Sequence, residues 1–154
     1  DFLVICTNTM HKVAPQIQEQ ISIPILHIAD ATADALLEAG IGTAALLGTK
    51  YTMTQDFYKA KLAERGIRVL VPEEEEIETV NRVIYEELCR GIISDESRKQ
   101  YVKIIEKLKE KGAQGVILGC TEIGLLVKQE DSPLPVFDTT AIHGYRAAME
   151  ALKD

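Results

Sequence analysis

Short apolar runs alternate with longer amphipathic stretches along the whole chain. Apolar runs bounded by glycine, proline or polar residues predict buried strands, and apolar residues that recur at helical spacing between them predict helices. The predicted strands are residues 2–6, 24–28, 43–47, 67–71, 115–119 and 134–138. The predicted helices are 10–20, a helix from Asp30 or Thr32 to Ala39, 53–65, an acidic helix from Pro72 to about Cys89, 96–111 capped by Asp95 or Ser94, and 139–152 capped by Thr139. This alternation predicts an α/β protein with helices packed on parallel sheets.

Composition and charge narrow the classes of partner. The 154 residues are 46% hydrophobic and 27% charged, which is typical of a soluble folded protein with one domain or two small lobes. Lys and Arg number 17 against 24 Asp and Glu, so the net charge of −7 argues against nucleic-acid binding. No apolar run approaches the roughly 20 residues that cross a bilayer. We therefore expect a cytoplasmic protein that does not bind membranes.

Cysteine usage argues against disulfides and zinc. Cys6, Cys89 and Cys120 are an odd number and show no C-x-x-C spacing. Free thiols in a reducing compartment fit this pattern better, and no metal is expected. The chain also begins at Asp1 inside a predicted strand and without an initiator Met. We therefore expect it to lack an amino-terminal part.

The candidate chemistry begins at the strand of residues 115–119, which is followed directly by Cys120, Thr121 and Glu122. The carboxyl ends of parallel strands are where α/β proteins bind ligands. A thiol at this end, with a hydroxyl and a carboxylate beside it, is therefore a candidate catalytic group. The alternative is a structural cysteine, because a free Cys packs well as a small hydrophobic residue.

Two other predicted strand ends carry small hydroxyl and amide side chains. Thr7, Asn8 and Thr9 follow the first strand, and Thr49 and Thr52 follow the third. Together with backbone amides at helix starts, such groups form a neutral cradle suited to a carboxylate. Each of them could instead act only as a helix cap. Three such ends in one crevice favour a site for a small anion.

Four motifs stand out along the chain: Cys-Thr-Asn-Thr-Met-His-Lys (6–12), Gly-Thr-Lys-Tyr-Thr-Met (48–53), Gly-Cys-Thr-Glu-Ile-Gly-Leu-Leu (119–126) and Pro-Val-Phe-Asp-Thr-Thr-Ala-Ile-His (135–143). Together they resemble the motifs of the aspartate/glutamate racemase family. The resemblance covers essentially the whole chain. It is strongest to the branch of broad-specificity or L-Asp/L-Glu-selective racemases in which Thr replaces the first catalytic Cys. It implies two Rossmann-like parallel-sheet lobes with the active site between them, the first lobe truncated at its amino-terminal end. It also implies a homodimer and a small amino-acid substrate, with neither pyridoxal phosphate nor metal.

The same resemblance implies a role for each site residue. Cys120 and Thr7 are the catalytic pair, which transfers protons on opposite faces of the α-carbon. The substrate-binding positions that it implies are Asn8, Thr9, Thr49, Thr52 and Thr121. Glu122 and Arg90 are further candidates on their own chemistry and not through the resemblance. Glu122 could tune Cys120 or be a solvated helix-start carboxylate; Arg90 is the candidate cation for a distal carboxylate.

Thr7 departs from the usual pattern of the family. An alkanol is a much weaker acid than a thiol, so we predict that one direction of proton transfer is slow. Cys6 does not replace the missing thiol if residues 2–7 are extended, because neighbouring side chains then point to opposite faces. We therefore interpret Cys6 as structural. His11 is open between a functional and a packing role, and His27 and His143 are interpreted as structural.

The resemblance also predicts the domain organisation. Residues 1–24 and 133–154 form the remnant of the first α/β domain, and residues 25–132 form the second. Two alternatives to an amino-acid racemase stay open at this point. One is a related Cys-dependent enzyme such as a hydantoin racemase or maleate isomerase, and the other is a carboxylate-binding protein without catalytic activity.

Overall fold

Two parallel sheets form the framework of the protein in a computed structural model that describes residues 1–153. The smaller sheet pairs β1 with β2, and the larger one has the strand order β4-β3-β5-β6. The strands are β1 (Leu3–Val4), β2 (Ile25–Leu26), β3 (Thr43–Gly48), β4 (Arg68–Leu70), β5 (Gly115–Gly119) and β6 (Val136–Asp138). The predicted mixed α/β architecture with parallel sheets is thus confirmed.

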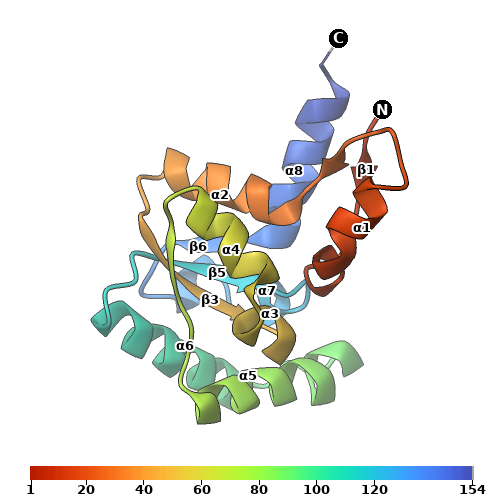
Figure 1. Cartoon of the computed structure of the whole chain (residues 1–154). Helices are drawn as coiled ribbons and strands as arrows, with labels where there is room; N and C mark the ends of the chain where they lie inside the picture. The colour runs from red at the N-terminus through yellow and green to blue at the C-terminus, as the bar shows by residue number, and fades with distance from the viewer. Residues whose placement is uncertain (154) are drawn as a thin grey trace.

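The helices cover both faces of the larger sheet (Figure 1). They are α1 (Ala14–Gln18), α2 (Ile28–Glu38), α3 (Lys50–Thr54), α4 (Asp56–Glu64), α5 (Glu74–Glu86), α6 (Asp95–Glu110), α7 (Ile123–Leu126) and α8 (Thr139–Ala151). Short 3-10 helices are η1 (Thr9–Val13), η2 (Leu88–Arg90) and η3 (Gln129–Asp131). No helix among residues 1–153 combines the length and the apolarity that crossing a membrane requires.

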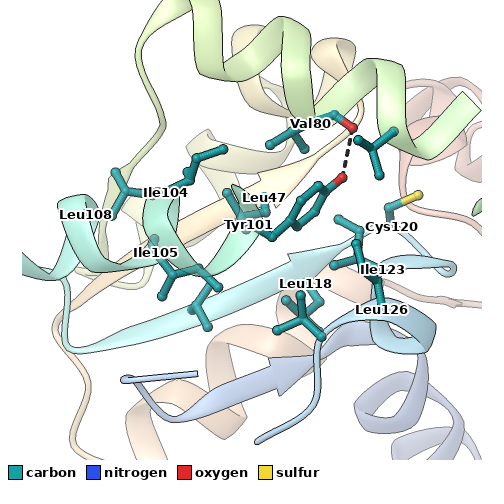
Figure 2. Close-up of a cluster of buried hydrophobic side chains, with 14 of the residues drawn as sticks. Leu47, Val80, Tyr101, Ile104, Ile105, Leu108, Leu118, Cys120, Ile123 and Leu126 are labelled. Atoms are coloured by element: carbon teal, nitrogen blue, oxygen red, sulfur yellow. Dashed lines mark hydrogen bonds between the residues drawn. The ribbon is translucent and has the colours of Figure 1, made fainter. Parts of the chain in front are cut away.

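The alternation of side chains along β3 builds two cores. Ala45 and Leu47 face α5 and α6, whereas Ala44 and Leu46 face α2 and α4, as the period of two in a strand requires. Figure 2 shows the first core, where Tyr101 of α6 donates a hydrogen bond of 2.8 Å to the carbonyl oxygen of Val80. Because both faces of β3 and β5 are buried, these strands are apolar at nearly every position.

Glycines allow β3 and β5 to approach closely at their carboxyl ends. Gly48 and Gly119 are register partners. A Cβ atom added to Gly119 would lie 2.9 Å from Leu46 Cδ1 and 3.0 Å from Leu47 O. The close approach brings the residues that follow the two strands, Thr49 and Cys120, to the same edge of the sheet.

The smaller sheet lies beside α1 and α8 (Figure 1). The imidazole Nε2 of His143, in α8, lies 2.7 Å from the carbonyl oxygen of Leu26 in β2. By sheet membership β2 groups with β1, and β6 groups with β5. The predicted domain division stays a prediction. Strand β2, which the prediction assigns to the second domain, pairs with β1, and β6, which it assigns to the first, pairs with β5.

Helix starts differ from the prediction at three places. Helix α2 begins at Ile28 with His27 as its cap, since His27 Nδ1 accepts a hydrogen bond from the Ala29 amide. Helix α8 is capped by Asp138, not Thr139, whose hydroxyl bonds β5 instead. Helix α3 begins directly after Thr49, and a break at Gln55 separates it from α4.

The amino-terminal segment also differs in part. The strand is Leu3–Val4 instead of residues 2–6, and the predicted 10–20 helix is η1 followed by α1, with Pro15 in the first turn of α1. Pro is tolerated there because the first amides of a helix have no partner within it.

Candidate active site

A pocket of about 330 Å³ lies at the carboxyl edge of β3 and β5. Its walls are residues 7–10, Thr49, residues 119–122, and Ile84, Tyr85 and Cys89 from α5 and η2. The predicted convergence of three strand ends is therefore present. Other pockets, of about 380 Å³ beside His27 and about 780 Å³ beside Asp1, do not include the thiol of Cys120. We identify the pocket that contains Cys120 as the candidate active site.

Cys120 is buried at the edge of the first core, and its sulfur points away from the apolar side chains (Figure 2). The Sγ–H donates a hydrogen bond of 2.9 Å to Glu122 Oε2. Burial, and then the hydrogen bond to the Glu122 carboxylate, raise the pKa of the thiol from 9.0 to about 12. Cys120 is therefore protonated at neutral pH.

Glu122 is half-buried beside this thiol. Burial alone would raise its pKa, but hydrogen bonds from Cys120 and Thr121 outweigh burial and lower it. The carboxylate is therefore ionised at neutral pH and holds the proton of Cys120 on the thiol. The hydrogen bond to Cys120 fits the first of the two alternatives for Glu122, and the tuning role stays a prediction.

Three threonine hydroxyls meet where Thr9 and Thr49 line the pocket. Thr9 Oγ1 lies 3.1 Å from Thr49 Oγ1 and 3.5 Å from Thr52 Oγ1, and the latter two are 3.1 Å apart. Thr49 also caps α3 by accepting a hydrogen bond from the Thr52 amide. Thr49 and Thr52 thus combine the capping role and the cluster that the sequence left as alternatives. Thr52 is fully buried behind Thr49 and does not itself line the pocket.

The turn that carries Thr7 is held by His11. Its Nδ1 lies 2.7 Å from the Thr7 carbonyl oxygen, and its Nε2 accepts a hydrogen bond of 3.2 Å from the Ile28 amide. Since Nε2 accepts, the proton of the neutral ring is on Nδ1, which donates to Thr7. Burial lowers the pKa of His11, which favours this neutral form. His11 therefore packs and hydrogen-bonds behind the pocket wall, next to His27 at a ring distance of 4.4 Å.

The remaining predicted residues divide between the pocket and its surroundings. Thr7, Asn8, Thr9, Thr121 and Glu122 line it together with Cys120, whereas Arg90 lies in η2, exposed and outside the lining. Cys6 is exposed and also outside the lining. Because β1 ends at Val4, strict strand alternation does not reach residues 6 and 7.

Sequence reasoning missed Met10, Ile84, Tyr85 and Cys89 as pocket residues. Tyr85 and Cys89 are four residues apart, which places them on one side of a helical segment. The sequence shows that spacing. It does not show which end of α5 lies over the edge of the sheet. Among residues 1–153 no group of three or more His, Cys, Asp or Glu side chains is arranged to hold a metal ion.

Comparisons with known proteins identify relatives of this chain. Residues 1–147 match the model of the family described as Asp/Glu/Hydantoin racemase. The broad specificity amino-acid racemase RacX of Bacillus subtilis is 26% identical over 145 residues, which are 92% of this chain and 60% of that protein.

Two crystal structures are closely similar. A candidate Asp/Glu racemase from Yersinia pestis is 54% identical with a TM-score of 0.94, over 99% of this chain and 66% of that one. An aspartate racemase homologue from Pyrococcus horikoshii is 39% identical with a TM-score of 0.89, over 99% of this chain and 67% of that one. The chain thus spans about two thirds of these relatives, and it belongs to the Asp/Glu/hydantoin racemase family.

Proposed function

We propose that this protein is a cofactor-independent amino-acid racemase that interconverts the L and D forms of aspartate- or glutamate-type substrates. The observation that carries the proposal is the placement of Cys120 and Thr7 in one pocket with the threonine and asparagine side chains of the cradle. Family membership adds weight, and so do the names of relatives, which include an aspartate racemase homologue and a broad-specificity racemase.

Racemisation needs one group to remove the α-proton and another to donate a proton to the opposite face. In the proposed reaction Cys120 serves one face and Thr7 the other, and neither pyridoxal phosphate nor a metal takes part. When the thiolate of Cys120 takes the α-proton, an S–H bond forms, and the hydroxyl of Thr7 gives its proton to the other face of the α-carbon. This leaves an alkoxide on Thr7, which regains a proton from water. The reverse direction requires Thr7 to act as base, which an alkanol does poorly.

The cradle supplies the binding contacts. The hydroxyls of Thr9 and Thr49 are donors for the α-carboxylate, and Thr121 lines the pocket beside Cys120. Arg90 stays the proposed cation for a distal carboxylate, carried on η2 next to Cys89. We further propose a homodimer in the cytoplasm, in keeping with the family resemblance.

The proposal is tested by exchange of the α-proton in heavy water. L- and D-aspartate and L- and D-glutamate are incubated with the protein, and the α-proton signal is followed by NMR while chiral chromatography follows inversion. For the unmodified protein we expect the α-proton signal to disappear and the opposite enantiomer to form. In Cys120→Ala we expect neither exchange nor inversion. Cys6→Ser is the matched control, because Cys6 is an exposed thiol outside the pocket lining.

The other outcomes separate the alternatives. Exchange without inversion would show that Cys120 works and that Thr7 fails as the opposite acid. Activity that persists in Cys120→Ala would contradict the proposed mechanism. Binding of the amino acids without exchange, in a folded and intact protein, would favour the carboxylate-binding alternative.

A further inference from the structure

His11 is a buried imidazole whose two ring nitrogens contact different parts of the chain. The side chain is 1% exposed. Its Nδ1 lies 2.7 Å from the Thr7 carbonyl oxygen, and its Nε2 accepts a hydrogen bond of 3.2 Å from the Ile28 amide. The first contact reaches a residue that lines the pocket, and the second reaches the start of α2. His11 therefore connects a proposed catalytic residue with an element outside the pocket.

The start of α2 fixes which nitrogen of His11 carries the ring proton. The first amides of a helix have no partner within it. His11 Nε2 accepts from the Ile28 amide, and His27 Nδ1 accepts from the Ala29 amide at 3.1 Å. An imidazole nitrogen that accepts carries no proton, and a cationic ring would also oppose the positive end of the helix dipole. Nδ1 of His11 is therefore the donor, and the Thr7 carbonyl oxygen accepts its proton.

The backbone of Thr7 is held on both sides. Its amide donates a hydrogen bond of 2.9 Å to the Ile5 carbonyl oxygen, and its carbonyl oxygen accepts from His11. Because peptide groups are planar, fixing the two that meet at a Cα atom fixes the direction of the Cα–Cβ bond. Rotation about χ1 then places the hydroxyl, and the branched Cβ of threonine restricts this rotation. Loss of the His11 bond would release the carbonyl side and let the hydroxyl shift.

Cys120 is held by other contacts. It directly follows β5, and its Sγ–H donates to Glu122. Strand β5 pairs with β3 and β6, whereas β1, which precedes Thr7, pairs with β2 in the smaller sheet. A change at His11 should therefore displace Thr7 and leave Cys120 in place.

We propose that His11 is a positioning residue that holds the hydroxyl of Thr7 where it can give its proton to one face of the α-carbon. The proposal rests on the proposed function, because it concerns one of the two proton transfers at that site. Without the contact, the Cys120 thiolate still takes the α-proton, and the electron pair of the C–H bond stays on the α-carbon. In heavy water the new S–H exchanges its proton for a deuteron, which returns to the same face. The expected defect is thus exchange without inversion.

Two variants separate the two contacts of the ring. The amide nitrogen of asparagine can take the place of Nδ1, so His11→Asn can still donate to Thr7. The longer glutamine reaches the place of Nε2, so His11→Gln can accept from Ile28 but no longer donates to Thr7. The intact protein is incubated with L- and D-aspartate in heavy water, where NMR measures exchange and chiral chromatography measures inversion.

The two variants should differ in one rate only. In His11→Gln we expect inversion to be about tenfold slower, because a small displacement of a reacting group is enough for such a loss. Exchange of the enantiomer that Cys120 deprotonates should slow by less than about twofold, since Cys120 is in place. His11→Asn should keep both rates within about twofold of the unmodified protein.

A role limited to holding the fold gives another pattern. Exchange and inversion that fall by the same factor in His11→Gln would overturn the proposal, and so would equal losses of inversion in His11→Asn and His11→Gln. His143→Gln is the matched control, because His143 Nε2 lies 2.7 Å from the Leu26 carbonyl oxygen and a glutamine amide can keep this bond. The ratio of inversion to exchange should be unchanged in this control.

Two NMR measurements need no substrate and separate this proposal from the proposed function. The nitrogen chemical shifts of the His11 ring in the unmodified protein should show a proton on Nδ1 and none on Nε2, and the reverse would overturn the proposal. Three-bond couplings to the Thr7 methyl group should show one rotamer in the unmodified protein and in His11→Asn, and averaging in His11→Gln. Equal couplings in all three would overturn the role of His11 even in an active racemase. The expected couplings without any racemisation would contradict the proposed function and still support the hold of His11 on Thr7.

Discussion

Replacing Glu122 by glutamine tests the physical account of the Cys120 thiol. The carboxylate accepts the Sγ–H at 2.9 Å and is the second cause, after burial, of the rise in the pKa of Cys120 to about 12. Glutamine keeps the size and the backbone amide, which itself favours the thiolate, and removes the charge. The Glu122→Gln variant should therefore have a lower pKa at Cys120 but not the ordinary value, because burial is unchanged.

The size of the change follows from the contact that is lost. A hydrogen bond to a charged group contributes about 1.5–3 kcal/mol, which corresponds to a fall in pKa of at least about one unit. The thiolate fraction at pH 8 then rises about tenfold. Since a less basic thiolate is also less nucleophilic, with a Brønsted coefficient of about 0.4–0.5, the net gain in alkylation rate is about three- to fourfold.

The assay is alkylation by iodoacetamide between pH 7 and pH 10, with the peptide that contains Cys120 quantified by mass spectrometry. Peptide resolution is needed because Cys6 and Cys89 are exposed and react as well. Glu110→Gln, on the exposed face of α6, is the matched control and should follow the unmodified protein. An unchanged rate at Cys120 in Glu122→Gln would refute the assignment of the raised pKa to this carboxylate.

Three further changes test other parts of the structure. Thr7→Cys should raise turnover of the disfavoured enantiomer by about tenfold or more in the chiral assay, and no gain would contradict the role of Thr7. Gly119→Ala should lower the free energy of unfolding by about 1–3 kcal/mol in denaturant melts, because the added Cβ collides with the Leu46 side chain and the Leu47 carbonyl oxygen. Gly42→Ala is the control: its Cβ makes only an ordinary contact, so the free energy of unfolding should fall less. Burial, and then the charges of neighbouring groups, lower the pKa of His27 to about 3, so the folded state holds the imidazole neutral. Below pH 6.5 the unfolded chain binds a proton at His27 that the folded protein does not, so the free energy of unfolding falls by about 1 kcal/mol per pH unit as the pH drops toward 3. Urea melts between pH 6.5 and 5 should show a shallower pH dependence for His27→Gln, and an unchanged slope would contradict the shift.

The sequence predicted the central strands well because both of their faces are buried. The run 115–119 coincides with β5, and 43–47 misses only the last residue of β3. Helix starts were harder, since a helix cap depends on which partner a side chain finds. Thr139 was predicted to cap α8, but its hydroxyl bonds Leu118, and Asp138 accepts from the first amides instead.

The candidate site divides along the same line. Residues that directly follow strands of one sheet, such as Thr49 and Cys120, were predictable because topology alone brings strand ends to one edge. Tyr85, Cys89 and Thr139 were not, because they reach the site through helix packing and through hydrogen bonds between residues far apart in the sequence. Arg90 was predicted as a site residue but lies outside the pocket lining, whereas its neighbour Cys89 in η2 lines the pocket.

The two proposed catalytic groups share a property that constrains the mechanism. Cys120 has a pKa of about 12 in the free protein, and an alkanol such as Thr7 is a still weaker acid, so both hold their protons at neutral pH. Glu122 does not remove the proton of the thiol, because its own pKa is lowered. A base must therefore arise when substrate binds. We propose that the ammonium group of the bound substrate is responsible, since a cation within about 4–6 Å of a thiol favours the thiolate and lowers its pKa.

This reasoning predicts that the pKa of Cys120 differs between the free protein and the complex. The kcat for aspartate reports the complex, whereas alkylation reports the free thiol. We expect kcat to level off below pH 10 while alkylation of Cys120 in the free protein still rises about tenfold per pH unit at pH 10. If kcat instead climbs in parallel with alkylation up to pH 10, the substrate does not assist the ionisation, and the thiolate must come from the small fraction already present in the free protein.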